Sequence, residues 1–423
     1  MTLPETTQLV TKIFLILLCL KAVTEAWLNQ KNRRYIANNK SEVPEKFKEQ
    51  ITLEEHQKAA NYSIEKIKVG KHFQTYDLII LLIWTFGGGI EALNTFSKSF
   101  NLSSIKTGLL FFGAFSLINM LIGLPESLYS TFVVEEKFGF NKTTKKIFIM
   151  DMVKGLAIGI TIGLPILAAL LWIMEALGNN WWVYGWAFLT ATQFFIICLY
   201  PTFIAPIFNK FSPLEEGAIK EKVVALLDRT GFKSNGLFVM DASKRSGHGN
   251  AYFTGFGKNK RIVFFDNLIS TLEPDEVEAV LAHELGHFKR KHILKQLIKG
   301  IVFSFLGFAI LGYLKNSPAF YQGHGVLSMD THLALVLFMM VSGIYTFFLT
   351  PLNAKTSRKY EFEADTFASE NAKAAKLISA LIKMYKDNAS TLTPDPTYSA
   401  FYHSHPPALI RVNFLESLIE KKG

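Results

Sequence analysis

The chain has 423 residues, of which 49% are hydrophobic and 13% aromatic, and its formal net charge is +10. Charged residues make up 19% of the chain, below the roughly 25% usual for soluble domains, and the mean hydropathy is positive at +0.22. This composition excludes a disordered, collagen-like or coiled-coil protein. The two cysteines, Cys19 and Cys198, both lie in apolar runs, so neither a disulfide framework nor a cysteine-based zinc site is expected.

Seven apolar segments are long enough to cross a bilayer, whose hydrocarbon core needs about 20 apolar helical residues. They lie at about residues 8–28, 75–94, 107–126, 153–177, 181–203, 296–315 and 332–352. The first is the weakest, because Lys12 and Lys21 flank a short apolar stretch, and it could instead be a signal peptide cleaved near Ala26. The sequence predicts a multi-span membrane protein embedded in the lipid bilayer. Its basic charge then reflects topology, and no nucleic-acid partner is expected.

Basic residues are unevenly distributed between these segments. The loop after the first segment contains Lys31 and Arg34, the loop after the third contains Lys142 and Lys145, and the alternate loops contain few. Short basic loops stay cytoplasmic, so seven spans place the N-terminus outside or in a lumen and the C-terminus in the cytosol. A cleaved signal peptide would instead export residues 28–73.

Two water-facing segments remain, residues 206–295 and 353–423, and the parity of the spans puts both in the cytosol. The second reads as helical, with breaks at its proline pairs. The patterns in the first are a helix at 213–230, β-rich runs at 236–240 and 261–265, and a helix that begins at Pro274, where proline and acidic residues suit a first turn.

The strongest signal is the sequence His283-Glu284-Leu285-Gly286-His287 on this last helix. Histidines four residues apart lie on the same helix face, so both imidazoles can bind one zinc ion, with Glu284 beside them as a general base. A chance HExxH in a chain of this composition is expected roughly 0.01 times, so coincidence explains the motif poorly. The helix is expected to continue directly from His287 through Lys295 into the next span.

A catalytic zinc needs a third protein ligand and an open position for water. The metzincin pattern would require Gly at position 290 and His at 293, but Arg290 and Ile293 stand there. The best candidate is Glu361, because two spans separate it from His287 and return the chain to the same side of the membrane.

Asp365 follows Glu361 by four residues, on the same helix face. One of these carboxylates could bind the metal while the other holds a ligand histidine through its remaining ring N–H. Glu363 is expected on a different face, and His292, five residues past His287, off the ligand face. Both are therefore left outside the predicted site.

These residues carry a family resemblance. The HELGH motif, the Ser357-Arg358-x-x-Glu361-x-x-x-Asp365 motif and seven spans together resemble the type I CAAX prenyl proteases, which are membrane zinc endopeptidases of the gluzincin kind. Further stretches that resemble the family are Leu124–Phe132, Glu135–Asn141, Tyr200–Asn209, and Ser404-His405-Pro406-Pro407 with Arg411. The likeness covers most of the chain and is weakest in its N-terminal third.

The resemblance implies a mainly α, polytopic protein of seven transmembrane helices that enclose a chamber, with a small α/β zincin-like catalytic domain. On this basis we divide the chain into four parts. They are a membrane region with five spans at 1–205, a catalytic domain with HELGH at 206–295, spans six and seven at 296–352, and a C-terminal catalytic segment with the third zinc ligand at 353–423.

The resemblance also implies roles for other residues. His405 and Arg411 match a pair that stabilises the scissile carbonyl as it becomes an oxyanion, or holds the carboxylates of the site. A further segment matches one that pairs with an extended substrate as an added strand. It consists of Asn250, Ala251, Tyr252 and Phe253.

The expected reaction is zinc-assisted peptide hydrolysis, with one Zn²⁺ per chain held by His283, His287 and Glu361, and with Glu284 as the base. The implied substrate is a prenylated CAAX peptide or protein that loses its last three residues. Two alternatives stay open. The chain could be a membrane quality-control protease for unmodified or misfolded peptides, or a transporter or scaffold in which zinc is structural.

The sequence does not specify the membrane. Relatives of this kind imply the endoplasmic reticulum membrane in a eukaryote or the inner membrane in a bacterium. The sequons Asn39-Lys-Ser41 and Asn61-Tyr-Ser63 lie in the basic segment, so their glycosylation in a eukaryotic host would show that this segment is lumenal.

Overall fold

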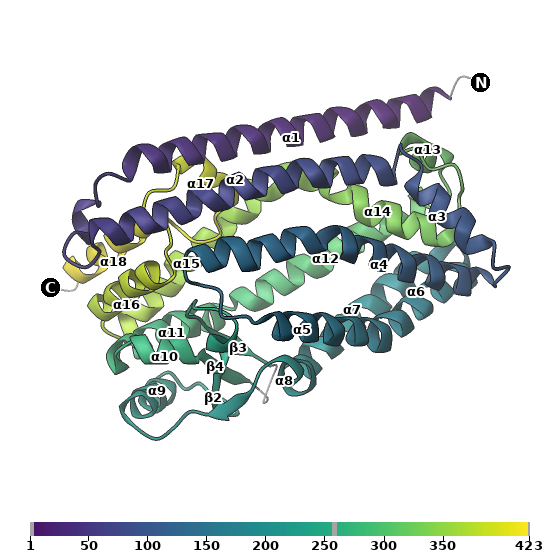
Figure 1. Cartoon of the computed structure of the whole chain (residues 1–423). Helices are drawn as coiled ribbons and strands as arrows, with labels where there is room; N and C mark the ends of the chain where they lie inside the picture. The colour runs from purple at the N-terminus through teal and green to yellow at the C-terminus, as the bar shows by residue number, and fades with distance from the viewer. Residues whose placement is uncertain (1–3, 256–259, 422–423) are drawn as a thin grey trace.

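The computed structural model describes residues 4–255 and 260–421, and these are mainly helical with one small sheet (Figure 1), as predicted. The helices of the first half are α1 Glu5–Asn39, α2 Leu53–Trp84, α3 Gly89–Lys98, α4 Ser104–Tyr129, α5 Lys145–Ile158, α6 Leu164–Ala176, α7 Trp181–Leu199 and α8 Ala205–Phe208. Those of the second half are α9 Ala218–Arg229, α10 Asp266–Thr271, α11 Pro274–Lys289, α12 His292–Leu314, α13 Pro318–Gly323, α14 Thr331–Thr346, α15 Thr350–Asn371, α16 Ala374–Asp387, α17 Pro396–Tyr402 and α18 Ala408–Glu420.

Within the described residues, five helical segments are long and apolar enough to cross a membrane. They are 104–135, 145–176, 178–208, 292–314 and 331–371. Each contains most or all of one predicted span. The bent pair of α2 and α3 gives a sixth and contains the predicted span at 75–94. The predicted first span lies in α1, which is not among these six, so the seventh span stays a prediction.

A glycine run explains the bend between α2 and α3. The two helices meet at 50° across a short break that contains Gly87 and Gly88. Gly88 has a φ of 77°, a left-handed conformation that costs glycine little and other residues more. The helix therefore breaks here and turns.

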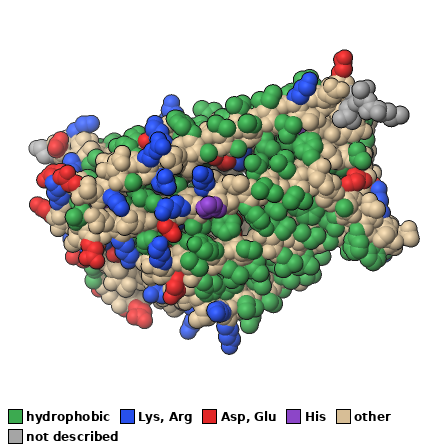
Figure 2. Space-filling model, turned by 45° about the horizontal axis from the view of Figure 1, so that its top comes forward, with side chains coloured by type: hydrophobic (Ala, Val, Ile, Leu, Met, Phe, Trp, Pro, Cys, Tyr) green, Lys and Arg blue, Asp and Glu red, His purple; other side chains and the backbone are tan. Residues whose placement is uncertain are grey.

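The molecule has a charged end and an apolar body. In Figure 1 the sheet, α9–α11, α16 and α18 lie together at one end of the long helices, and Figure 2 shows charged side chains concentrated there while hydrophobic ones cover much of the rest. The accessible surface is 21960 Å², whereas a compact protein of this mass would expose roughly 16,400 Å². The helices therefore form an open arrangement with much exposed surface.

The sheet has four strands in the order β1-β2-β4-β3. Strands β2 and β4 are parallel, and β3 pairs antiparallel with β4 at the edge, with Ala251 opposite Phe264. The strands are β1 Phe211–Pro213, β2 Leu237–Met240, β3 Ala251–Thr254 and β4 Arg261–Phe265. The two predicted β-rich runs are thus confirmed as β2 and β4. The helix predicted at 213–230 is α9, but its start is wrong, because β1 ends at Pro213 and α9 begins at Ala218.

A hydrophobic core at the charged end of the molecule holds α11 between the sheet and the C-terminal helices. Val277, Leu281 and Leu285 are buried in it together with Phe264 of the central strand β4. Apolar residues spaced three and four positions apart make one helix face apolar, and here that face is buried. Helix α11 also packs against α15, whose Ala368 belongs to the same core.

Helices α11 and α15 pack unusually close together. A Cβ atom built on Gly286 would lie 2.9 Å from the Cα atom of Ala364, closer than real side chains approach. Small residues on both helices therefore let the two backbones approach, as at other tight helix crossings. This crossing brings the HELGH helix against the helix that carries Glu361.

Candidate metal centre

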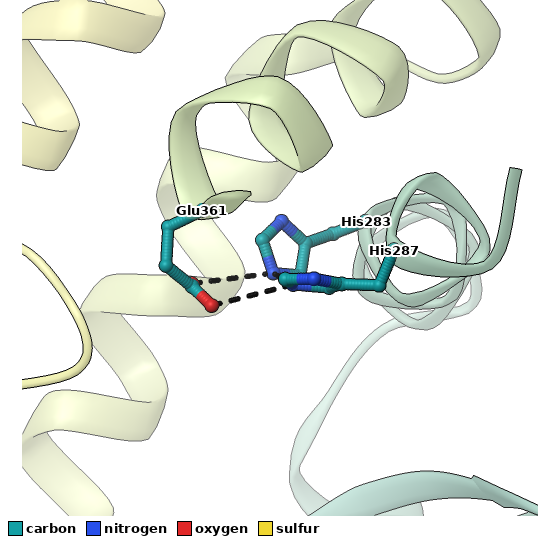
Figure 3. A group of neighbouring side chains, drawn as sticks. All are labelled: His283, His287 and Glu361. Carbon is teal, nitrogen blue, oxygen red and sulfur yellow. Dashed lines mark hydrogen bonds and ion pairs between the residues drawn. The ribbon is translucent and has the colours of Figure 1, made fainter. Parts of the chain in front are cut away.

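Two histidines and one glutamate converge where α11 crosses α15 (Figure 3). His283 Nε2 and His287 Nε2 are 3.2 Å apart. Glu361 Oε2 is 3.5 Å from His283 Nε2, and Glu361 Oε1 is 3.3 Å from His287 Nε2. One ligand atom from each residue lies within 4.8 Å of those of the other two. The sequence prediction thus named three side chains that do lie together.

The three residues fit a bound metal cation. His283 and Glu361 are buried, and Glu361 Oε2 makes no hydrogen bond of acceptable geometry although it is inaccessible to solvent. Basic groups near this oxygen are His405 Nδ1 at 2.8 Å and Arg411 Nη1 at 3.5 Å, and a bound metal ion would be a further partner for it. Two imidazoles and a carboxylate are the donor set of catalytic zinc sites, in which the fourth position stays open.

The carboxylate of Asp365 contacts the His283 ring on the side away from the metal position, and Arg411 binds that carboxylate. Its Nδ1 is 2.8 Å from Asp365 Oδ1, and Arg411 donates to both carboxylate oxygens of Asp365, at 2.7 and 2.8 Å. Burial and the charge of Arg411 lower the pKa of His283, but the carboxylates of Asp365 and Glu361 outweigh them and raise it to about 9. Without a metal the ring is therefore protonated at neutral pH. A bound cation would displace the Nε2 proton, while Nδ1–H stays donated to Asp365 and leaves the Nε2 lone pair for the metal.

His287 is oriented by a second histidine that we predicted to lie outside the site. His287 Nδ1 is 3.1 Å from His292 Nδ1, and His292 Nε2 is 2.8 Å from Glu363 Oε2. A carboxylate accepts only, so His292 donates through Nε2 and accepts through Nδ1. His287 must then donate through its Nδ1, and its Nε2 lone pair also faces the metal position.

His292 and Glu363 are not among the three ligand residues, as expected. The prediction missed their hydrogen bonds behind His287, and the reason is a break in the chain. Helix α11 ends at Lys289, Lys291 has a φ of 59°, and α12 begins at His292. This break contradicts the expectation of a helix running directly from His287 through Lys295. The turn brings the His292 ring back to His287, where it also stacks on Tyr360 at 4.2 Å. A lysine with a left-handed backbone conformation leaves no clear signal in the sequence.

Glu284 and His405 lie on the accessible side of the centre. Glu284 is half-buried and has no hydrogen bond or ion pair within residues 4–255 and 260–421. The side chain of His405 is 64% exposed, with Nδ1 2.8 Å from Glu361 Oε2. Arg411, in contrast, is buried behind Asp365. The sequence left two roles open for His405 and Arg411. The contacts of Arg411 with Asp365 fit the role of holding a carboxylate of the site.

Arg358 of the second motif contacts neither ligand histidine. Its guanidinium donates to the carbonyl oxygens of Ser399, Ala400 and His403, at 3.1, 3.1 and 2.7 Å. These carbonyls end helix α17, where the last C=O groups lack helical partners. Arg358 thereby ties the segment that leads to His405 against α15.

The predicted substrate segment forms the edge of the sheet. Ala251, Tyr252 and Phe253 belong to β3, and Asn250 precedes it, with its carbonyl accepting from Phe265 N at 2.9 Å. Antiparallel pairing alternates inward and outward groups, so the main chain of Ala251 and Phe253 faces the open edge. Strand β3 also contacts the metal-binding helix α11.

Fold and centre together define an integral-membrane metallopeptidase of the HExxH type. Comparison with protein families agrees. A family model described as the CAAX prenyl protease N-terminal region with five membrane helices matches residues 32–210, and the model of peptidase family M48 matches residues 213–419.

Individual relatives match over nearly their whole length. CAAX prenyl protease 1 of Saccharomyces cerevisiae is 35% identical over 416 residues, covering 92% of each chain. A CAAX prenyl protease 1 homolog of Homo sapiens is 33% identical over 93% of this chain and 92% of that protein. The crystal structure of S. mikatae Ste24p superposes with a TM-score of 0.90 at 32% identity, covering 98% of this chain and 100% of that one. The chain belongs to the type I CAAX prenyl protease family of M48 metallopeptidases.

Proposed function

We propose that this metallopeptidase is a zinc enzyme that removes the last three residues of prenylated CAAX proteins. The observation that carries the proposal is the convergence of His283, His287 and Glu361 at the charged end of a membrane-spanning bundle. Relatives named CAAX prenyl protease 1, alike over almost the entire chain, supply the substrate class. The metallopeptidase family excludes the transporter or inactive scaffold.

The metal we propose is a single Zn²⁺ per chain, held by His283, His287 and Glu361. When bound, zinc lowers the pKa of a water molecule toward about 7 and polarises a carbonyl group. Asp365 and His292 fix the two imidazoles in the tautomers that present Nε2. Arg411 neutralises Asp365 and keeps it in place.

Glu284 is the proposed general base. Its carboxylate is half-buried, has no hydrogen-bond partner in the described chain and projects from the turn between the two ligand histidines. It accepts a proton from the attacking water and passes it to the nitrogen of the leaving amine. His405, exposed at the mouth of the centre, donates toward the carbonyl oxygen as negative charge develops there.

The substrate is proposed to add to the open edge of β3. The Ala251 N–H already donates to Asn250 Oδ1 at 2.8 Å. The other outward main-chain groups of Ala251 and Phe253 would pair with an extended peptide, which gives binding that tolerates different side chains. The metal-binding helix leads within a few residues into the span at 292–314. A peptide anchored by a prenyl chain would therefore be concentrated beside the centre, because each buried CH₂ contributes about 0.8 kcal/mol to membrane partitioning.

We further propose that the metal centre faces the cytosol, from the endoplasmic reticulum membrane if the host is a eukaryote. The basic segment 28–73, which runs from the end of α1 into α2, lies at the same end as the centre. Its Lys46 pairs with Glu416 of α18, and Glu55 of α2 pairs with Lys386 of α16 at 2.9 Å. Basic loops stay cytoplasmic, so the catalytic end would do the same.

The test compares a farnesylated CAAX peptide with its unprenylated twin, using purified protein in liposomes and mass spectrometry of the products. We expect loss of the last three residues from the farnesylated peptide and much slower cleavage of the twin. Equal cleavage of both peptides would overturn the lipid preference and favour the quality-control protease. No cleavage by zinc-loaded protein would overturn the proposal.

A further inference from the structure

A cavity of about 710 Å³ opens beside the metal centre, between α1 and α2 on one side and the C-terminal segment on the other. His405 and Asn250 line it, so it adjoins both the centre and the start of the edge strand. Its size is within the range of ligand-binding pockets. Its wall contains many aromatic and hydroxyl side chains, among them Tyr62 of α2.

The lining of this cavity is suited to an anion. Among its described lining residues there is no Asp or Glu, and Lys66 of α2 is the one Lys or Arg. Lys66 Nζ lies over the ring of Tyr62, 4.8 Å from its centroid, and forms no ion pair within the described chain. Lys68, two residues on, instead lies 3.9 Å from Glu65.

The three histidines of the wall already have other contacts. His248 Nε2 is 3.5 Å from Glu135 and its ring stacks on Phe140 at 4.3 Å. His405 contacts Glu361 at the metal centre. Burial and the nearby charges of Arg358 and His405 lower the pKa of His403, which keeps that ring neutral. Lys66 therefore supplies the uncompensated positive charge of the cavity.

The cavity lies at the Asn250 end of β3. Phe253, late in the strand, packs against Phe232 with ring centroids 5.4 Å apart. At the early end, Asn388 donates to and accepts from the main chain of Gly249, at 3.4 and 3.1 Å, and so holds the cavity wall in place. A peptide along β3 can therefore extend into open space beside Asn250.

Lys66 also lies near the residues that precede β3. The ring of His248, two residues before Asn250, is 6.4 Å from that of Tyr62, over which Lys66 lies. The cavity also reaches His405 at the metal centre, so a tripeptide of about 10 Å released at the centre would enter the cavity that Lys66 lines.

We propose that this cavity binds the three residues released from the substrate and that Lys66 binds their C-terminal α-carboxylate. The proposal rests on the proposed function, in which the leaving fragment is a tripeptide with a free carboxylate. It accounts for a lysine without an ion pair in a cavity without acidic side chains. It also predicts a preference for cleavage near a chain end, because an internal site has no carboxylate at this position.

The experiment measures kcat/KM for a farnesylated CAAX peptide as the free acid and as the C-terminal carboxamide. We expect wild-type protein to favour the acid about tenfold, the effect of one charge-assisted hydrogen bond. Lys66→Met should bring the ratio of acid to amide close to one, chiefly through KM. Lys66→Arg should restore the preference. Lys68→Met, a lysine outside the cavity, is the matched control and should keep it.

A wild-type ratio of one would overturn the inference without any variant, so it does not depend on Lys66→Met folding. An unchanged acid preference in folded Lys66→Met would also overturn it. In both cases the farnesylated peptide is still cleaved, and the proposed function stands. Zinc-loaded wild-type protein that cleaves neither peptide would instead overturn the proposed function, and this inference with it.

Discussion

At the scale of single residues, the metal centre depends on which ring nitrogen of each histidine carries the proton. Asp365 fixes His283 directly, whereas Glu363 fixes His287 through the ring of His292. Both chains of hydrogen bonds end with an Nε2 lone pair directed to the same point. Such supporting groups orient the ligands before the metal arrives.

Replacing His292 tests the longer of these chains. His292→Ala leaves the three ligands in place but frees the ring of His287, so we expect zinc affinity to fall about 10- to 100-fold. Competition with a chromophoric chelator measures this. The matched control is His72→Ala, a histidine exposed on α2, which should bind zinc as wild type does. Equal zinc affinity of the His292→Ala and control proteins would contradict the relay.

At the scale of helices, the crossing of α11 and α15 sets the distance between the histidines and Glu361. Gly286→Ala would place a methyl group 2.9 Å from Ala364 Cα, so the helices must separate. Overpacking of this kind costs about 1–3 kcal/mol. We expect a lower apparent Tm and weaker zinc binding.

Gly300→Ala in α12 is the matched control, because a Cβ atom there meets nothing within 4 Å. Alanine also favours a helix over glycine by about 1 kcal/mol. Its thermal stability should equal or exceed that of wild type. If Gly286→Ala were as stable and bound zinc as tightly as Gly300→Ala, close packing would not determine the site.

The contacts of Glu276 on α11 with two residues of α16 make the stability of the protein depend on pH. Glu276 is buried and accepts from Ser379 at 2.6 Å and Lys383 at 2.7 Å. Burial raises the pKa of Glu276, but these donors and the Glu273 amide outweigh it and lower the pKa. The stabilisation is therefore complete above the unfolded-state pKa and is lost as pH falls through the lower, folded-state value.

Glu276→Gln should be less stable than wild type at pH 7, by about 2 kcal/mol for the lost charge-assisted bonds. Its apparent Tm should also fall less than that of wild type when the pH is lowered from 6 to 3. Glu221→Gln on the exposed face of α9 serves as the control. Parallel pH profiles for wild type and Glu276→Gln would refute the assignment.

The predictability of these elements depends on how local their cause is. The spacing of His283 and His287 on one helix is local, and span counting was enough to return Glu361 to the same side. Lys291, with its φ of 59°, breaks the helix although no glycine or proline marks this position in the sequence. The contact of His292 with His287 was therefore not predicted. The position of Lys66 depends on how α2 packs beside the C-terminal segment, which no local pattern encodes.

At the scale of the whole molecule, the separation of charged and apolar surface fixes how the protein lies in the membrane. Six spans follow from length and composition once the bent pair is counted. Helix α1 is not among these spans, yet it packs along α2, α13 and α14. Phe14 and Leu18 of α1 are buried in the hydrophobic core between the long helices, and this burial depends on residues distant in sequence.

The cytosolic orientation can be tested with the natural sequons at Asn39 and Asn61. Both lie at the catalytic end, where Asn61 accepts from Lys40 at 3.3 Å. In a eukaryotic host we expect them to stay unmodified, so that an Asn39→Gln, Asn61→Gln double variant migrates like wild type before and after glycosidase treatment. A glycan lost from the double variant would place the metal centre in the lumen.

The central claim is that one zinc ion and Glu284 together hydrolyse the peptide. The most direct measurement determines zinc content and cleavage of the farnesylated peptide on the same preparations of wild type, Glu284→Gln and His283→Ala. We predict one zinc per chain in wild type and in Glu284→Gln, with turnover only in wild type, and loss of both zinc and turnover in His283→Ala. Glu284→Gln protein that binds zinc and cleaves at the wild-type rate would contradict the account.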